Sequence, residues 1–127
     1  MLETKGRPRE TLELLSNRIN LLEGVEKVLM KMYLENGSSV RQMARLTGVS
    51  ETTMARRIRK MTERLMDGQY INCLRCRSEF TKTELAIAKD YFLMGISMRR
   101  IAANRRSTYY FVRETLKKIR GFLESGK

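Results

Sequence analysis

The chain has 127 residues, 42% of them hydrophobic, and its 26 Lys and Arg against 14 Asp and Glu give a net charge of +12. This apolar content suits one ordinary domain or two small ones and argues against a disordered chain. Apolar stretches are only a few residues long and the first ten residues lack a signal-peptide core, so we expect neither a membrane span nor secretion, but a cytoplasmic protein.

The positive charge is concentrated in two blocks. Residues 37–66 contain seven Lys and Arg against two acidic residues, and residues 97–127 contain nine against two, whereas residues 1–36 and 67–96 are balanced. Sliding the chain by 58 positions aligns Val25–Leu65 with Thr83–Leu123, with nine identities and a shared apolar pattern. We therefore predict an internal duplication and two similar units that bind a polyanion.

The first predicted unit spans residues 1–66 and opens with a helix after Pro8. Its apolar residues recur every three or four positions, a spacing that also suits a short two-stranded helical seam. This first stripe comprises Leu12, Leu15, Ile19 and Leu22. A second helical stripe ends at Asn36-Gly37 and comprises Val25, Val28, Leu29, Met32 and Tyr33.

A helix pair follows in the first basic block. Ser39 and Gln42 form a capping box, which predicts a short helix from Val40 to about Leu46. A tight turn is predicted at Thr47-Gly48-Val49, and Ser50 is predicted to cap a longer helix. The buried stripe expected on this longer helix comprises Met54, Ile58, Met61 and Leu65.

Residues 67–80 are predicted to be a connector that contains Cys73 and Cys76. A Cys-x-x-Cys supplies half of a tetrahedral zinc site, and the chain has no His and no further Cys to complete one. We therefore expect no metal and two reduced thiols, with a zinc ion shared between two chains as the alternative.

The second predicted unit, residues 81–127, repeats this plan. Thr81 and Glu84 form a capping box for a helix that Gly95 stops, and Ser97 and Thr108 cap two further helices. The inward stripe of the last helix comprises Val112, Leu116, Ile119 and Leu123. No strand pattern occurs, so the expected fold is all-α: two tandem three-helix helix-turn-helix units with an extra N-terminal helix.

The start of the longer helix in each pair is free to enter a DNA major groove. Side chains near these two starts are predicted to read bases: Glu51, Thr52, Thr53, Arg56, Arg57, Tyr109, Tyr110 and Arg113. Other basic side chains are predicted to contact phosphates: Arg41, Arg45, Arg59, Lys60, Arg64, Arg99, Arg100, Arg105, Arg106 and Lys117.

Residues 39–58, with the sequence SVRQMARLTGVSETTMARRI, resemble the three-helix DNA-binding unit of bacterial transcription regulators. They are similar in type to the C-terminal, promoter-binding helix-turn-helix of sigma factors, although no segment resembles the part of sigma factors that opens promoter DNA. The resemblance implies promoter or operator binding by a bacterial or phage-type regulator. It also implies that Thr52, Thr53, Arg56 and Arg57 occupy the positions that usually read sequence.

The second unit departs from this pattern at its turn, where Arg106 replaces Gly48 and Ser107 replaces Val49. Because Arg is disfavoured at positive φ, we expect this turn to use Asn104 instead or to adopt another geometry. We therefore expect the first unit to contribute more sequence reading and the second more phosphate anchoring.

Catalysis has little support, since the chain has no His and no nucleophile, phosphate-loop or paired-carboxylate signature. We expect no enzyme activity and no cofactor. The expected partner is double-stranded DNA, with RNA polymerase as a further candidate, and the chain is expected to be a monomer or homodimer. The alternatives are a sigma-like interaction module that docks on RNA polymerase or another regulator, and a protein that binds structured RNA.

Overall fold

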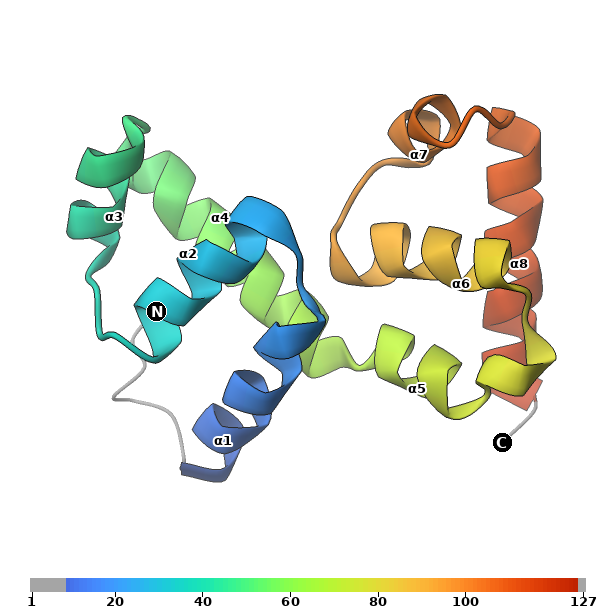
Figure 1. The fold of residues 1–127 in the computed structure, drawn as a ribbon, viewed down its shortest axis with the longest axis horizontal. Coiled ribbons are helices and arrows are strands. Elements are labelled where there is room, and N and C mark those ends of the chain that lie inside the picture. Colours follow the sequence, from blue (N-terminus) through green and yellow to red (C-terminus); the bar gives the residue numbers. More distant parts are fainter. Residues whose placement is uncertain (1–8, 126–127) are drawn as a thin grey trace. The chain divides into compact units, whose positions relative to one another are not determined.

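The computed structural model describes residues 9–125, and these are helical with short turns and no strand (Figure 1). The all-α prediction is therefore confirmed. The predicted helix start at Pro8 and the N-terminal stretch considered as a signal peptide lie largely outside the described residues.

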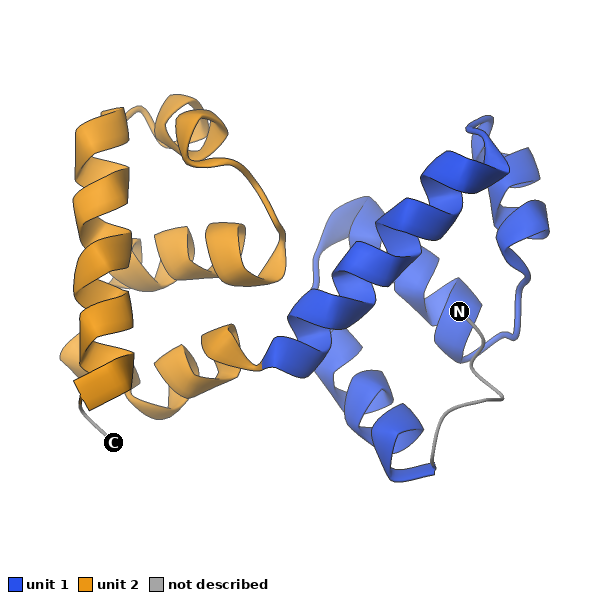
Figure 2. Cartoon of the chain, turned by 180° about the vertical axis from the view of Figure 1, so that it is seen from behind, with its two compact units in different colours: residues 1–67 blue, residues 68–127 orange. Residues whose placement is uncertain are grey.

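The chain divides into two compact units, residues 1–67 and residues 68–127, called unit 1 and unit 2 below (Figure 2). Unit 1 consists of α1 (Arg9–Arg18), a 3₁₀ turn (Ile19–Leu21), α2 (Gly24–Leu34), α3 (Val40–Thr47) and α4 (Glu51–Asp67). Unit 2 consists of α5 (Gln69–Arg75), a 3₁₀ turn (Arg77–Glu79), α6 (Lys82–Ala88), a π-helical turn (Lys89–Leu93), α7 (Met98–Asn104) and α8 (Tyr109–Ser125).

The helix starts follow the capping residues that the sequence predicts. The capping boxes of Ser39 with Gln42 and of Thr81 with Glu84 are both complete, with side-chain and backbone groups bonded reciprocally. The Ser97 hydroxyl accepts a hydrogen bond from the Arg100 amide at 3.2 Å. Each cap satisfies amides that have no partner within the helix, and such a cap is typically worth about 1 kcal/mol.

The core of unit 1 contains the predicted stripe of α4, whose four residues are at most 1% exposed. Leu15 of α1, Ile19 of the following turn and Leu22 directly after it are buried as predicted, whereas Leu12 of the same predicted stripe is only partly buried. Truncating one of these side chains to Ala is expected to cost about 2–5 kcal/mol.

The predicted stripe of α2 is partly wrong. Val25 and Val28 are 61% and 57% exposed, and the buried side chains of this helix are Leu29, Met30 and Tyr33. The helix begins only at Gly24, and the face that packs against the rest of unit 1 passes through Met30, so Val25 and Val28 fall on the solvent side.

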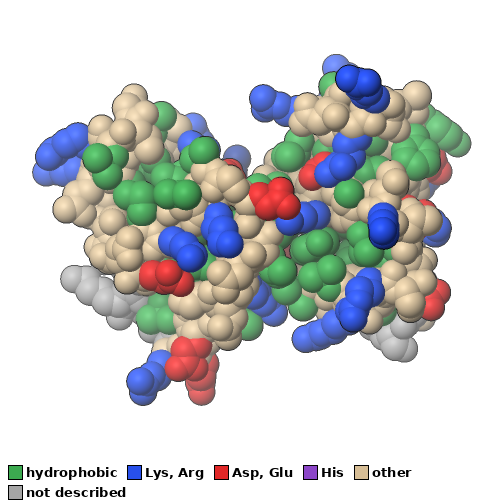
Figure 3. All heavy atoms as spheres, in the orientation of Figure 1, with side chains coloured by type: hydrophobic (Ala, Val, Ile, Leu, Met, Phe, Trp, Pro, Cys, Tyr) green, Lys and Arg blue, Asp and Glu red, His purple; other side chains and the backbone are tan. Residues whose placement is uncertain are grey.

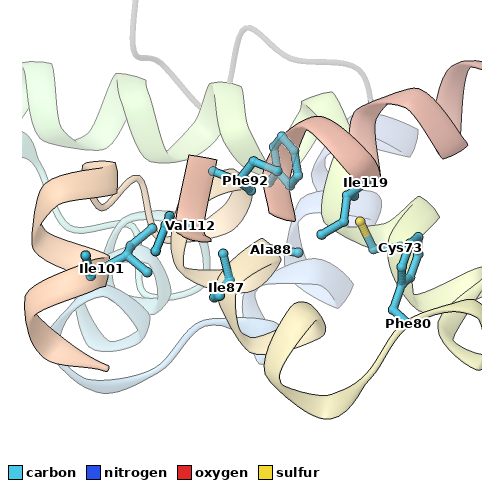
Figure 4. Packing of buried hydrophobic residues seen from close by; sticks show 10 residues of the cluster. Cys73, Phe80, Ile87, Ala88, Phe92, Ile101, Val112 and Ile119 are labelled. Atoms are coloured by element: carbon cyan, nitrogen blue, oxygen red, sulfur yellow. The ribbon is translucent and has the colours of Figure 1, made fainter. Parts of the chain in front are cut away.

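The core of unit 2 is shown in Figure 4, where side chains from α5, α6, α7 and α8 converge. Cys73 and Phe80 lie near Ala88 and Ile119 at one end of it. The three buried residues of the predicted α8 stripe are Val112, Leu116 and Ile119, while Leu123 is only partly buried against this core.

The segment predicted as a connector is therefore largely part of unit 2. Its residues form α5 and a 3₁₀ turn, and Cys73 and Phe80 are 0% and 9% exposed. Both cysteines are free, and burial, followed by the nearby Cys76 sulfur, raises the pKa of Cys73 to about 11. The two units join at Gly68, which separates α4 from α5.

The elements of the two units share one spacing along the chain. The helices α4 and α8 begin at Glu51 and Tyr109, 58 positions apart, and the two 3₁₀ turns begin at Ile19 and Arg77, again 58 apart. The supposed connector thus stands at the position of α1 and its turn. These boundaries support the predicted duplication and extend it to the N-terminal helix of unit 1.

Candidate nucleic-acid interface

The turn between α3 and α4 has the geometry expected of a helix-turn-helix. Gly48 follows α3 in the left-handed region, with φ +79° and ψ 11°, and its amide donates to the Ala44 carbonyl at 2.9 Å. A Cβ at Gly48 would contact nothing within 4 Å, so glycine is needed for its backbone angles rather than for space. Ala44, 4% exposed, is a small buried residue of α3 one turn before Gly48.

The first turn of α4 is capped and open to solvent. The Thr53 amide donates to the Ser50 hydroxyl at 3.1 Å, which satisfies one of the free amides at the helix start. Glu51 and Thr52 are exposed, and Thr53 is half-buried. An open hollow borders this turn and is lined by Arg41, Ala44, Arg45, Gly48, Val49, Ser50 and Glu51.

Four of the cations predicted on this surface are exposed and form no ion pair within residues 9–125: Arg45, Arg56, Arg59 and Lys60. Arg45 is on α3 and the other three are on the face of α4 opposite its buried stripe. Arg41 differs, because its Nε lies 3.2 Å from Glu51 Oε2 in an exposed pair. An exposed pair of this kind contributes little to stability and is easily opened by a phosphate.

Two predicted contact residues of unit 1 are held inside the unit. Arg57 donates to Glu26 Oε1 of α2 through Nε at 3.2 Å and Nη2 at 3.0 Å. Arg64 is half-buried, and burial lowers the pKa of its guanidinium while Glu26 and Glu63 act in the opposite direction. Arg57 thus links α4 to α2, and both side chains are less exposed than the four cations named above. Their contacts with bases or phosphates stay predictions.

The turn of unit 2 adopts the left-handed conformation at Arg106, with φ +54°, and not at Asn104. The expectation for Asn104 is wrong, because this residue is the last of α7 and the chain reverses two residues later. The Ser107 amide donates to the Ala102 carbonyl at 2.8 Å and the Arg106 amide to the Ala103 carbonyl at 3.3 Å. This bonding closes a helix C-terminus in which glycine usually occupies the left-handed position.

A neighbouring ion pair braces this strained turn. Arg105 donates to both oxygens of Asp90, through Nε at 2.6 Å and Nη2 at 3.1 Å, and the Asp90 side chain is only 14% exposed. Arg105 is thus engaged in an internal bidentate pair, and its phosphate contact stays a prediction. Arg99, Arg100 and Arg106 are exposed and form no ion pair within the described part of the chain.

The first turn of α8 exposes three successive aromatic side chains. Tyr109, Tyr110 and Phe111 are 45%, 67% and 45% exposed, and the Phe111 amide is bonded to the Thr108 hydroxyl at 3.0 Å. The sequence analysis named the two tyrosines and missed Phe111, although Phe111 corresponds to Thr53 at the 58-residue spacing. Figure 3 shows hydrophobic surface at the start of α8 beside Lys and Arg side chains over α7.

Two other predicted contacts lie further along α8. The Arg113 guanidinium lies 6.0 Å from the centre of the Tyr110 ring and 3.2 Å from Glu114 Oε2, and the Lys117 amine lies 3.8 Å from the same oxygen. All three charged side chains are at least a third exposed, so these are weak surface pairs. Both cations therefore remain accessible to a ligand.

Comparison with known proteins identifies one similarity. Residues 19–62 match the helix-turn-helix domain family. No curated protein and no solved structure matches the chain. Among the described residues, no helix is long and apolar enough to cross a membrane, and no three candidate metal ligands cluster.

The matched segment runs from the turn after α1 into α4 and includes the whole of the α3–turn–α4 geometry. Gly48 at its turn, the capped start of α4 and the exposed cations around it are what such a module requires to approach a nucleic-acid backbone. The match and the geometry together support a helix-turn-helix DNA-binding module in unit 1.

Proposed function

We propose that the protein is a sequence-specific double-stranded DNA-binding regulator that inserts the start of α4 into a major groove. The observation that carries this proposal is the exposed, Ser50-capped first turn of α4, together with four exposed cations of α3 and α4 that form no ion pair within residues 9–125. Such cations are available to replace the counterions of a phosphate backbone. A transcriptional role, sigma-like or of another bacterial or phage type, belongs to this proposal.

Exposure and internal bonding support a choice among the proposed contact residues. Thr52, Thr53 and Arg56 are the best candidates for base contacts in unit 1, with Glu51 beside them. Arg45, Arg59 and Lys60 are suited to phosphates. Arg57 is assigned a positioning role, because its bonds to Glu26 tie α4 to α2 and so set the angle at which the helix is presented.

Unit 2 is proposed to anchor the complex through phosphates. Arg99 and Arg100 are in the first turn of α7 and Arg106 is in the turn that follows it, all exposed. No base-reading side chain of the Arg56 type is present at the matching position, where α8 has Glu114. We therefore assign less sequence discrimination to this surface.

Selection of bound duplexes from a random pool, followed by a salt titration, tests the proposal. Duplex binding through about six phosphates is expected to weaken roughly a thousandfold between 50 and 200 mM salt. Arg56→Ala is expected to lower the ratio of specific to random affinity, because one good base contact discriminates by about 1–3 kcal/mol.

The matched control is Lys82→Ala, which removes an exposed cation from the start of α6, outside the proposed surface. It is expected to leave the affinity ratio unchanged. Affinity that barely responds to salt would contradict the proposal and favour docking on a protein, and an enriched structured RNA in a parallel selection would favour RNA binding.

A further inference from the structure

We propose that the aromatic start of α8 is a binding site for unpaired bases of a single-stranded polynucleotide, DNA or RNA. This inference adds a second ligand to the proposed function and does not require unit 1 to read a duplex. The site consists of Tyr109, Tyr110 and Phe111 and is called the aromatic turn below.

All three rings of the aromatic turn are exposed to solvent. Each of the three rings leaves 45% or more of its residue surface in solvent, although aromatic residues in a small domain usually fill the core. None of the three rings belongs to the core of unit 2 or to the partly buried side chains packed against it, and the buried residues of α8 begin at Val112. The exposed part of each ring is therefore available to a ligand.

The charges around the aromatic turn select the kind of partner. Arg99, Arg100 and Arg106 are exposed on α7 and the adjoining turn, and Arg113 lies over the Tyr110 ring at 6.0 Å. The nearest carboxylate along α8, Glu114, is already paired with Arg113 and Lys117. Apolar rings with arginines on the same helix-turn-helix element are complementary to a polyanion that also carries flat apolar groups.

The matching positions in unit 1 have side chains of a different chemistry, which distinguishes the aromatic turn from a surface that reads base edges in a groove. The residues at the matching positions of α4 are Glu51, Thr52 and Thr53, whose carboxylate and hydroxyl groups can exchange hydrogen bonds with base edges. Phe111 has no hydrogen-bonding group and each tyrosine has only one. Ring faces suit stacking on bases, which is open to them only where the bases are unpaired.

Arg106 adds an independent indication that this surface is shaped for a ligand. Its left-handed φ of +54° is unfavourable for any residue with a Cβ, and its exposed side chain forms no ion pair in the described structure. Backbone strain of this kind is concentrated at functional sites. A guanidinium held at the edge of the aromatic turn would meet the phosphate of a base stacked there.

The test measures the affinity of the full chain for three fluorescent probes: a 20-nucleotide oligo(dT), a 20-nucleotide oligo(U) and a blunt 20-base-pair duplex. Replacing all three rings by Leu keeps charge, helix propensity and apolar character but removes the π faces. Since one stacked base is worth roughly 5-fold to 150-fold in affinity, we expect this variant to lose at least about tenfold for a single strand.

The matched control is Tyr109→Phe with Tyr110→Phe, which keeps every ring and is expected to retain single-strand affinity within about threefold. Duplex affinity of the Leu variant is expected to change far less than its single-strand affinity. Stronger binding of oligo(dT) or of oligo(U) identifies which polynucleotide is the ligand. Tyr110→Leu alone, at the most exposed ring, is the substitute if the triple variant is unfolded by circular dichroism.

Three outcomes would overturn the inference: no binding of either single strand by the native chain, single-strand affinity retained by the Leu variants, or an equal loss for duplex and single strand. The last would mean that the rings act inside a groove. If the duplex binds and the single strands do not, only this inference fails, whereas failure of duplex binding bears on the function proposed for unit 1.

Discussion

In unit 1 the left-handed residue between the two helices is Gly48, whereas unit 2 has Arg106 at the matching position. The first turn is relaxed, because glycine adopts the left-handed conformation without steric cost. The second has a strained residue next to the bidentate pair of Arg105 with Asp90. A helix-turn-helix geometry can therefore be reached through backbone preference or through tertiary contacts that override it.

The difference extends to what each turn presents. Unit 1 has polar side chains at the start of its long helix, and unit 2 has three aromatic rings. The residues just before the left-handed position also differ. Unit 1 has Thr47, whose hydroxyl donates to the Met43 carbonyl, and unit 2 has the cation Arg105 at the matching position. The two units share one backbone plan and are proposed to have different ligands.

The largest expected effect is on the brace of unit 2. Asp90→Ala removes the two hydrogen bonds that Arg105 donates to this carboxylate, and the loss of this partly buried pair is expected to destabilise the turn by about 1–3 kcal/mol. Hydrogen exchange of the Ser107 amide, which closes the turn, measures the effect. The Gly48 amide of unit 1 is the internal control, and unchanged exchange at Ser107 would show that the pair is not a brace.

Transferring the unit 2 residue to unit 1 tests the relaxed turn. Gly48→Arg is expected to destabilise unit 1 by about 1–2 kcal/mol, because the left-handed conformation is unfavourable and position 32 has Met in place of the bracing Asp90. Urea unfolding measures the change in free energy. Gly48→Asn is the control and should cost less, since Asn tolerates this conformation; equal costs would point to a clash, which the open space around Gly48 does not predict.

The reverse change separates stability from binding. Arg106→Gly is expected to stabilise unit 2 by about 1 kcal/mol through relief of backbone strain. It should also reduce the slope of log affinity against log salt by about 0.9, because one phosphate contact is lost. A rise in stability with unchanged salt dependence would remove Arg106 from the proposed interface.

The smallest effect concerns a carboxylate that both units share by position, Glu26 and Glu84. Burial alone would raise the pKa of the Glu84 carboxyl. Hydrogen bonds from Lys118 and from the Thr81 backbone outweigh this effect, and the pKa is lowered overall. Its folded-state pKa therefore lies below its unfolded value. The resulting stabilisation of unit 2 is present at neutral pH and is lost as the pH falls through the folded-state pKa.

Glu84→Gln provides the comparison for this pH dependence, because Gln42 fills the same role in the capping box of α3. The variant should keep its helix cap and lose only the ion pair, a change expected to be below about 1 kcal/mol. Urea midpoints measured from neutral to acidic pH should converge for native and variant chains. A constant difference at all pH values would show that the carboxylate charge is not responsible.

Much of the fold follows from local signals in the sequence. Ser39, Ser50, Thr81, Ser97 and Thr108 each mark a helix start, because a short polar side chain before a helix satisfies its free amides. The stripes of α4 and α8 are equally visible, since both helices are long and strongly periodic. These signals require no knowledge of distant contacts.

What the sequence did not reveal depends on tertiary packing. Asn104 has the better intrinsic preference for a left-handed turn, but α7 continues through it and Arg106 takes that conformation. The α5 segment escaped notice because it has no residue identical to α1 at the 58-residue spacing. Arg57 and Arg105 looked like free cations because their partners, Glu26 and Asp90, are 31 and 15 positions away.

The two sulfur atoms have a practical consequence. Both cysteines of the chain belong to unit 2, and the thiol of Cys73 is inaccessible and protonated in the folded unit. A chemical label that reacts with thiolates can therefore modify Cys73 only when the helices around it separate. The rate at which Cys73 is modified therefore measures how often unit 2 opens. It can be measured in the native sequence, with or without a ligand bound to unit 1.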